Sequence, residues 1–126
     1  MTLDDAIRRA LASDRTIDIT TIGRRSGEPR RIEIWFYRYD GRVFLSGSPG
    51  RRDWYANLVA HLEFTFHLKG SVQADLSARA RPITDEDERR EVVAGILDEL
   101  GRGSASAREW VEGSPLAEVE FVDEPG

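Results

Sequence analysis

Residues 17–46, IDITTIGRRSGEPRRIEIWFYRYDGRVFLS, carry the clearest folding signal in this chain. Apolar and polar side chains alternate from Ile17 to Ile22 and again from Arg31 to Tyr39, which is the pattern of half-buried β-strands. Glycines and a proline at 23–29 separate these strands, and Asp40-Gly41, a dipeptide typical of two-residue hairpin turns, follows the second. The stretch therefore predicts consecutive antiparallel strands, with a third strand returning after the Asp-Gly turn.

Outside this stretch, the sequence predicts helices at 3–11, 53–59, 84–100 and 104–111 and strands at 64–68, 71–83 and 117–121. The expected helix N-caps are Thr2, Asp53 and a capping box that begins at Thr84. Because strands adjacent in sequence are joined by short turns, the sheet is expected to be antiparallel. We expect it to close into a small barrel with appended helices.

Length and composition indicate one globular domain over residues 1–126, since 40% of the residues are hydrophobic and 33% are charged. The chain has no cysteine, which excludes disulfides and thiol chemistry, and only two histidines, which argues against a metal site. No apolar run reaches the ~18–20 residues of a membrane span, and the N-terminus lacks the order of a signal peptide. A cytoplasmic protein is expected.

Charge is distributed unevenly along the chain, whose formal net charge is −5. Residues 21–54 carry eight arginines against four acids, whereas residues 84–126 carry thirteen acids against four arginines. Arginine recognises phosphate and carboxylate through its planar fork of N–H donors, so the basic segment is a candidate anion site. The overall acidity argues against a nucleic-acid partner. Solvated surface charge remains the alternative for each single arginine.

Two segments are suited to an anionic ligand. Residues 20–31 combine four arginines with glycines and hydroxyl side chains, a set that suits phosphate but lacks the ending of a P-loop. Residues 46–58 run from a glycine-rich loop into a helix, where free backbone amides suit the carbonyl edge of a flat ring. We expect Asn57 to reach back and hold this loop, and we expect His67 to lie on the surface.

The sequence shows no Ser-His-Asp spacing, no paired carboxylates on one face and no dinucleotide-binding fingerprint. If the protein is an enzyme, the reactive group is therefore expected to come from a bound cofactor, which needs orientation more than a side-chain acid or base. No catalytic side chain is assigned. Tyr37 or Tyr39 is the candidate to stabilise developing negative charge on an acceptor.

The motifs Thr-Thr-x-Gly-Arg-x-Ser-Gly-x-Pro-Arg at 20–30 and Trp-Tyr-x-Asn-Leu at 54–58 resemble the deazaflavin-dependent nitroreductase family. That family lies within the split β-barrel flavin-binding superfamily that includes pyridoxamine-phosphate oxidase. The similarity runs from about residue 17 to residue 83. It implies a mainly β fold, a six-stranded antiparallel split β-barrel, that binds coenzyme F-420 in a groove.

The resemblance also implies roles for particular residues. Arg24, Ser26 and either Arg30 or Arg31 would hold the anionic tail of the cofactor, and Ser46, Gly47, Ser48 and Gly50 would hold the ring edge, with Arg51 or Arg52 near the phosphate. The loop before Trp54 is shorter than is usual in the family, so FMN remains an alternative cofactor.

The function implied is a deazaflavin-dependent oxidoreductase that passes hydride to a small planar acceptor, such as a quinone, an enone or a nitroaromatic. An FMN-dependent relative and a non-catalytic protein that binds a flavin or a haem-like ligand are the alternatives. The expected partners are therefore the cofactor and the acceptor. The sequence does not choose between a monomer and a homodimer.

Overall fold

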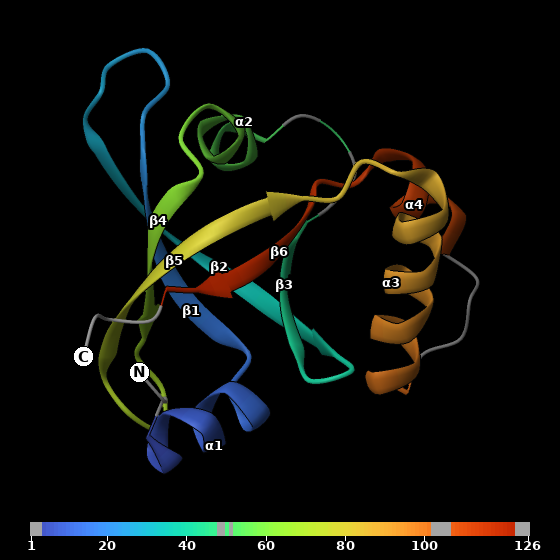
Figure 1. Cartoon of the computed structure of the whole chain (residues 1–126), viewed down its shortest axis with the longest axis horizontal. Coiled ribbons are helices and arrows are strands. Elements are labelled where there is room, and N and C mark those ends of the chain that lie inside the picture. The colour runs from blue at the N-terminus through green and yellow to red at the C-terminus, as the bar shows by residue number, and fades with distance from the viewer. Residues whose placement is uncertain (1–3, 48–49, 51, 102–106, 123–126) are drawn as a thin grey trace.

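The computed structural model describes residues 4–47, 50, 52–101 and 107–122, and within them it contains six strands and four helices (Figure 1). The strands are β1 (Thr16–Ile22), β2 (Pro29–Tyr39), β3 (Arg42–Ser46), β4 (Glu63–Leu68), β5 (Ala74–Pro82) and β6 (Leu116–Phe121). The helices are α1 (Asp5–Ser13), α2 (Asp53–Ala60), α3 (Glu86–Glu99) and α4 (Ala107–Gly113).

The strands form a closed barrel in the order β1-β2-β3-β6-β5-β4, and every neighbouring pair is antiparallel. The split-barrel prediction is confirmed. The β2–β3 turn also forms as expected, because Asp40 and Gly41 both adopt positive φ angles, 54° and 71°. The barrel closes where β1 pairs with β4, with Ile19 opposite Phe66.

Two apolar cores stabilise the molecule. Inside the barrel, Phe66 packs edge-to-face against Phe36 and Phe121, with ring centroids 5.5 and 5.2 Å apart. Outside it, Phe44 of β3 points to the opposite face and is buried under the apolar sides of α3 and α4. Figure 1 shows these two helices side by side against one flank of the barrel, which leaves both barrel ends to α1 and α2.

Helix α3 lies so close to β2 that only glycine fits at the contact. A Cβ atom at Gly95 would lie 2.1 Å from Cδ1 of Tyr39. On the same flank, the ring of Tyr37 packs edge-to-face against Trp110, with centroids 5.4 Å apart. Both tyrosines therefore pack against the second core, and neither lines the cavity beside the β1–β2 turn that is described below.

Several expected boundaries are corrected. The N-cap of α2 is Arg52 and that of α3 is Asp85, whose carboxylate accepts the N–H of Glu88, so Asp53 and Thr84 do not cap these helices. The expected cap Thr2 lies outside the described residues, and Asp4 caps α1. Strand β5 begins at Ala74. No helix among the described residues is long and apolar enough to cross a membrane.

Candidate functional site

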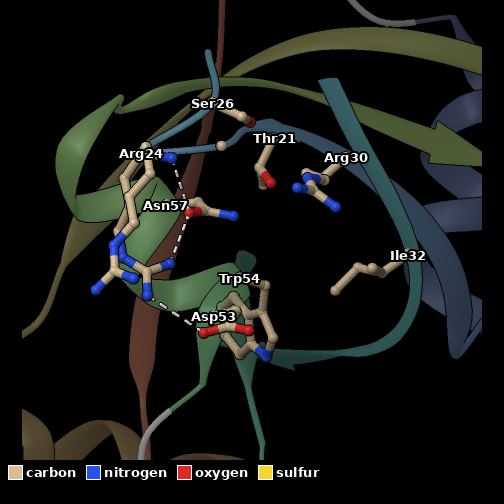
Figure 2. A pocket seen from close by; sticks show the side chains of 10 residues that line it. Thr21, Arg24, Ser26, Arg30, Ile32, Asp53, Trp54 and Asn57 are labelled. Atoms are coloured by element: carbon tan, nitrogen blue, oxygen red, sulfur yellow. Dashed lines mark hydrogen bonds and ion pairs between the residues drawn. The ribbon is translucent and has the colours of Figure 1, made fainter. Parts of the chain in front are cut away.

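A cavity of about 500 Å³ opens between the β1–β2 turn and the start of α2, at one end of the barrel (Figure 2). It is lined by Thr21, Gly23, Arg24, Arg25, Ser26, Arg30, Ile32, Asp53, Trp54 and Asn57. Residues 20–31 and the start of the 54–58 motif thus border one space. This volume lies in the range of small-molecule sites.

The backbone of the turn between β1 and β2 is held by its own hydrogen bonds. Gly23 N–H donates to Glu28 O at 2.8 Å, and Gly27 N–H donates to Gly23 O at 2.9 Å. The hydroxyl of Ser26 accepts the N–H of Glu28 at 3.1 Å, and a Cβ at Gly23 would lie 2.5 Å from that hydroxyl oxygen. Ser26 therefore shapes the turn, and its hydroxyl acts as an internal acceptor.

Asn57 joins the turn to α2. Its Oδ1 accepts two hydrogen bonds from Arg24, one from the backbone N at 3.1 Å and one from Nη1 at 3.0 Å. Asn57 is only 6% exposed, and these bonds orient its amide so that Nδ2, which has no partner among the described residues, points into the cavity (Figure 2). Asn57 was expected to hold the loop after β3. It holds instead the turn between β1 and β2 (residues 23–28), which we call the arginine turn.

Thr21 and Arg30 are cross-strand partners that enter the cavity from the barrel side. Thr21 is 1% exposed, and its hydroxyl has no hydrogen-bond partner among the residues described. Every fully buried side-chain oxygen or nitrogen among the described residues has a hydrogen-bond partner. Because the Thr21 hydroxyl has none, it must be accessible from the cavity, and Figure 2 shows it there. A hydroxyl and a guanidinium thus lie next to each other at the wall.

Positive charge dominates the cavity. Arg24 is the one cavity arginine paired with an acid in the described chain, through an Nη2–Oδ1 distance of 3.3 Å to Asp53, whose side chain is 91% exposed. The guanidinium groups of Arg25 and Arg30 have neither an ion-pair nor a hydrogen-bond partner in the described ranges. Two forked cations without an ion-pair partner suit a phosphate or carboxylate ligand.

The opposite walls of the cavity are apolar. Trp54, from the first turn of α2, and Ile32, from β2, border the same space and are only partly buried (Figure 2). The sequence analysis gave neither residue a role in ligand binding. The strand alternation offered a signal, because Thr21, Arg30 and Ile32 all belong to the inward-facing sets of β1 and β2.

Strand geometry places Arg30, and not Arg31, at the wall of the cavity. Neighbouring residues of a strand point to opposite faces, so Arg31 points away from the cavity that Arg30 lines. Its Nε donates to Oδ2 of Asp18 at 3.0 Å on the outer face of the barrel. Arg31 is therefore not part of this cavity.

The second expected segment, the loop after β3, does not line this cavity in its described part. The Ser46 hydroxyl is buried and fully used, since it donates to Pro115 O at 2.6 Å and accepts from Trp110 Nε1 at 2.7 Å. Gly47 lies next to the Trp54 ring, since a Cβ there would be 3.7 Å from Cζ2 of Trp54. Gly50 and Arg52 line a separate cavity of about 330 Å³. Ser48 and Arg51 lie outside the described residues.

His67 is buried, contrary to expectation, with 6% of its surface exposed. Its Nε2 lies 2.7 Å from the hydroxyl oxygen of Thr20, and its Nδ1 lies 2.7 Å from Oδ1 of Asp75. The bond from His67 lowers the pKa of Asp75, which is exposed. This polar chain lies on the outer face of β1, β4 and β5, away from the cavity, and no group of metal-ligating side chains occurs among the described residues.

The chain matches a known protein family over most of its length. Residues 4–102 match the model of a family described as F420H(2)-dependent quinone reductase. The match covers more than half of the chain, and it includes both segments that border the cavity.

Solved structures show the same fold at low sequence identity. A conserved hypothetical protein from Mycobacterium tuberculosis is 17% identical, with a TM-score of 0.74 over 98% of this chain and 83% of that one. An F420-H2 dependent reductase is 20% identical, with a TM-score of 0.62 over 85% and 95% of the two chains. A pyridoxamine 5'-phosphate oxidase-like protein from Listeria innocua is 10% identical, with a TM-score of 0.67 over 94% and 93%.

Proposed function

The chain belongs to the F420H(2)-dependent quinone reductase family, and from that premise we propose that it binds coenzyme F-420 in the cavity beside the arginine turn. The reaction would be reduction of a small planar acceptor, namely a quinone, an enone or a nitroaromatic. When bound, the reduced deazaflavin supplies the hydride. The observation that carries the proposal is the pairing of unpartnered guanidinium groups with an apolar wall in one cavity of about 500 Å³.

The residues of the cavity fit a flat anionic molecule. Arg25 and Arg30 offer forked donors that no carboxylate in the described chain occupies, so they would bind phosphate or carboxylate groups. Trp54 and Ile32 present apolar surface that would contact a ring and exclude water. The Asn57 amide nitrogen and the Thr21 hydroxyl would hydrogen-bond polar edges of the ligand, with Asn57 held rigidly by Arg24.

The residues named from the resemblance then divide into two groups. Arg30 would contact the ligand directly, whereas Arg24 and Ser26 would act mainly by fixing the turn, since the Arg24 guanidinium already bonds to α2 and the Ser26 hydroxyl already bonds within the turn. Gly47, Gly50 and Arg52 would contact only a part of the ligand that extends beyond the cavity toward α4. Ser46 would contribute through its backbone, because its hydroxyl is already used twice.

Adjacent arginines provide a matched pair for the test. Oxidised F-420 is titrated by fluorescence against the wild type, Arg30→Gln and Arg31→Gln, with FMN titrated in parallel. Losing a charge-assisted bond in the cavity should weaken F-420 binding about tenfold or more in Arg30→Gln. Arg31→Gln removes the same charge from the outer face, so its affinity should stay within about twofold of the wild type.

The outcomes separate the alternatives. Equal weakening in both variants would show that only the general charge matters, and the cavity assignment would fail. Binding of FMN but not F-420 would replace the cofactor, and binding of neither would end the proposal. Oxidation of reduced F-420 is then followed with one quinone, one enone and one nitroaromatic. Cofactor binding without turnover on any of them would favour a binding protein over a reductase.

A further inference from the structure

A second cavity of about 500 Å³ lies between α1 and the β2–β3 hairpin. Figure 1 shows these elements at the end of the barrel opposite to α2 and the arginine turn. The residues that matter here are Arg8, Leu11, Arg38, Val43 and Phe121, all of which line it. We propose that this cavity is a second ligand site, which takes a monocarboxylate with an apolar aliphatic or aromatic body.

Arg38 is the group that would bind the carboxylate. It follows Phe36 on the inward face of β2, and its guanidinium lies 5.2 Å from the centroid of the Phe36 ring. Nη1 donates to the backbone oxygens of Leu11 and Asp14, at 2.9 and 2.6 Å. These bonds hold the side chain under the C-terminus of α1, while Nε and Nη2 have no partner among the described residues.

The charge of Arg38 is poorly compensated within the chain. No carboxylate in the described part of the molecule lies within ion-pair distance of it, although Glu99 and Asp14 act on it from further away. Burial, followed by the nearby charge of Arg15, lowers the pKa of Arg38. A half-buried guanidinium with an open Nε–Nη2 edge is a natural receptor for a carboxylate, which matches that edge with two parallel bonds.

The other charged groups of the cavity are either exposed or already paired, so Arg38 is its main half-buried charge. Arg8 is exposed and has no partner in the described chain, whereas Arg42 is already bound by Glu118. Asp40 and Glu99 also line the cavity, but both are exposed, so water screens them more than it screens Arg38.

The apolar part of the lining selects the body of the ligand. Leu11 and Val43 are 9% and 8% exposed, and Phe121 at the end of β6 is partly buried against the barrel core. Inorganic phosphate would gain nothing from these side chains, whereas an alkyl or aryl group would be stabilised by burying its apolar surface against them. The combination therefore favours an amphiphilic carboxylate.

The test uses octanoate as the probe and backbone amide NMR shifts as the readout. Shifts at Arg8, Ala12 and Gly41 report this cavity, and shifts at Arg24 and Asn57 report the other. Octanol, which has the same chain without the charge, and inorganic phosphate, which has charge without the chain, are titrated as comparison ligands. The experiment needs no F-420, so its result is independent of the function proposed above.

Two variants on α1 form the matched control. Arg8→Gln removes a charge that lines the cavity and should weaken octanoate binding about two- to fivefold, whereas Arg9→Gln removes a neighbouring charge that does not line it. Arg38→Gln should weaken binding about tenfold or more, with circular dichroism to show that α1 remains folded. If that variant unfolds, the Arg8 and Arg9 pair decides.

Octanoate shifts confined to the first group of amides, with octanol and phosphate at least about tenfold weaker, would support the proposal. Absence of shifts at these amides, octanol binding as tightly as octanoate, or equal effects of the two α1 variants would each overturn it. Shifts at Arg24 and Asn57 alone would place the carboxylate in the first cavity and would likewise overturn it.

Discussion

Arginines on two sides of this barrel have very different partners. In the ion-pair cluster, formed by Arg42, Arg81, Glu88 and Glu118, Arg81 binds Glu88 at 3.0 and 2.7 Å and Glu118 at 3.2 and 2.8 Å. Arg42 binds Glu118 through two further bonds of 3.0 and 3.1 Å. At the β1–β2 turn, by contrast, the guanidinium groups of Arg25 and Arg30 meet no acid among the residues described.

The difference is not caused by a shortage of acids, since the chain has 23 aspartates and glutamates against 18 basic residues. The ion-pair cluster forms because β5 and β6 place Arg81 directly opposite Glu118, and α3 then brings Glu88 to the same point. The turn lies at the other end of the strands, beyond these acids. The residue type alone therefore does not show whether an arginine stabilises the fold or is free to bind a ligand. The residues around it in the folded protein show this.

The largest effect on stability is expected for Arg81→Met. Glu88 and Glu118, which are 31% and 16% exposed, would lose their shared partner, so the free energy of unfolding should fall by about 2 kcal/mol. Chemical denaturation measures this loss. Arg79→Met, two residues earlier on the same face of β5, serves as the control and should change stability by less than about 0.5 kcal/mol. Equal losses in both variants would show that the ion-pair cluster contributes nothing specific.

A smaller loss is expected for Asn57→Ala, which removes the link between the β1–β2 turn and α2. The variant leaves the backbone N–H of Arg24 without its acceptor, at a cost of about 1–2 kcal/mol. Because the turn then loses its anchor to α2, F-420 affinity should fall as well. If stability falls while affinity stays at the wild-type value, the turn does not need this anchor to bind the cofactor.

Acid should weaken the ion-pair cluster but not the turn. The bond from Arg81 lowers the pKa of Glu88, and for Glu118 burial raises the pKa but the bonds from Arg42 and Arg81 outweigh it, so its pKa is also lowered. A lowered folded-state pKa stabilises the protein above the ordinary value of 4.5, and this contribution is lost as the pH falls through the folded-state pKa values.

This loss should amount to about 1 kcal/mol after allowance for solvent screening. Urea denaturation of the wild type and of a Glu88→Gln, Glu118→Gln variant at several pH values from neutral down to the acid transition measures it. The variant should show a flatter acid limb. An unchanged acid limb would mean that other carboxylates cause the acid sensitivity.

The smallest effect is expected at the turn itself. Arg25→Gln and Arg30→Gln break no ion pair or hydrogen bond in the described chain, so each should leave the free energy of unfolding within about 0.5 kcal/mol of the wild type. Thermal and chemical unfolding measure this. A loss above about 1 kcal/mol in either variant would mean that these arginines stabilise the fold, and the contrast between the two regions would disappear.

The strand pattern was readable from the sequence because alternation is local. The inward residues from Ile17 to Thr21 and from Ile32 to Phe36 are apolar or small at every second position, and Asp40-Gly41 supplies the two positive φ angles that the hairpin needs. The helix ends were less readable. Several residues at the start of α3 are chemically able to cap, and Asp85 is the one that does so, whereas α2 begins after Arg52, which makes no side-chain cap hydrogen bond.

The burial of His67 shows the limit of the same reasoning. The alternation along β4 places His67 on the face opposite Phe66, and from this strand alone that face is predicted to be exposed. Its neighbours Thr20 and Asp75 come from β1 and β5. Strand β5 follows β4 along the chain, but β1 lies beside β4 only because the barrel closes. A buried polar side chain with partners on both sides cannot be recognised until the strand order is known.

By itself, the sequence determined the strands, the turns, the family motifs and the presence of a basic segment in an acidic chain, because these depend on neighbours within a few residues. Tertiary structure alone decided which arginines are neutralised, that Asn57 holds the turn rather than its own loop, that Arg30 and not Arg31 enters the cavity beside Trp54, and that glycine is required where α3 crosses Tyr39. The physical reason is that ion pairing, hydrogen bonding and steric fit act over a few ångströms, and barrel closure brings within that range residues that are far apart along the chain.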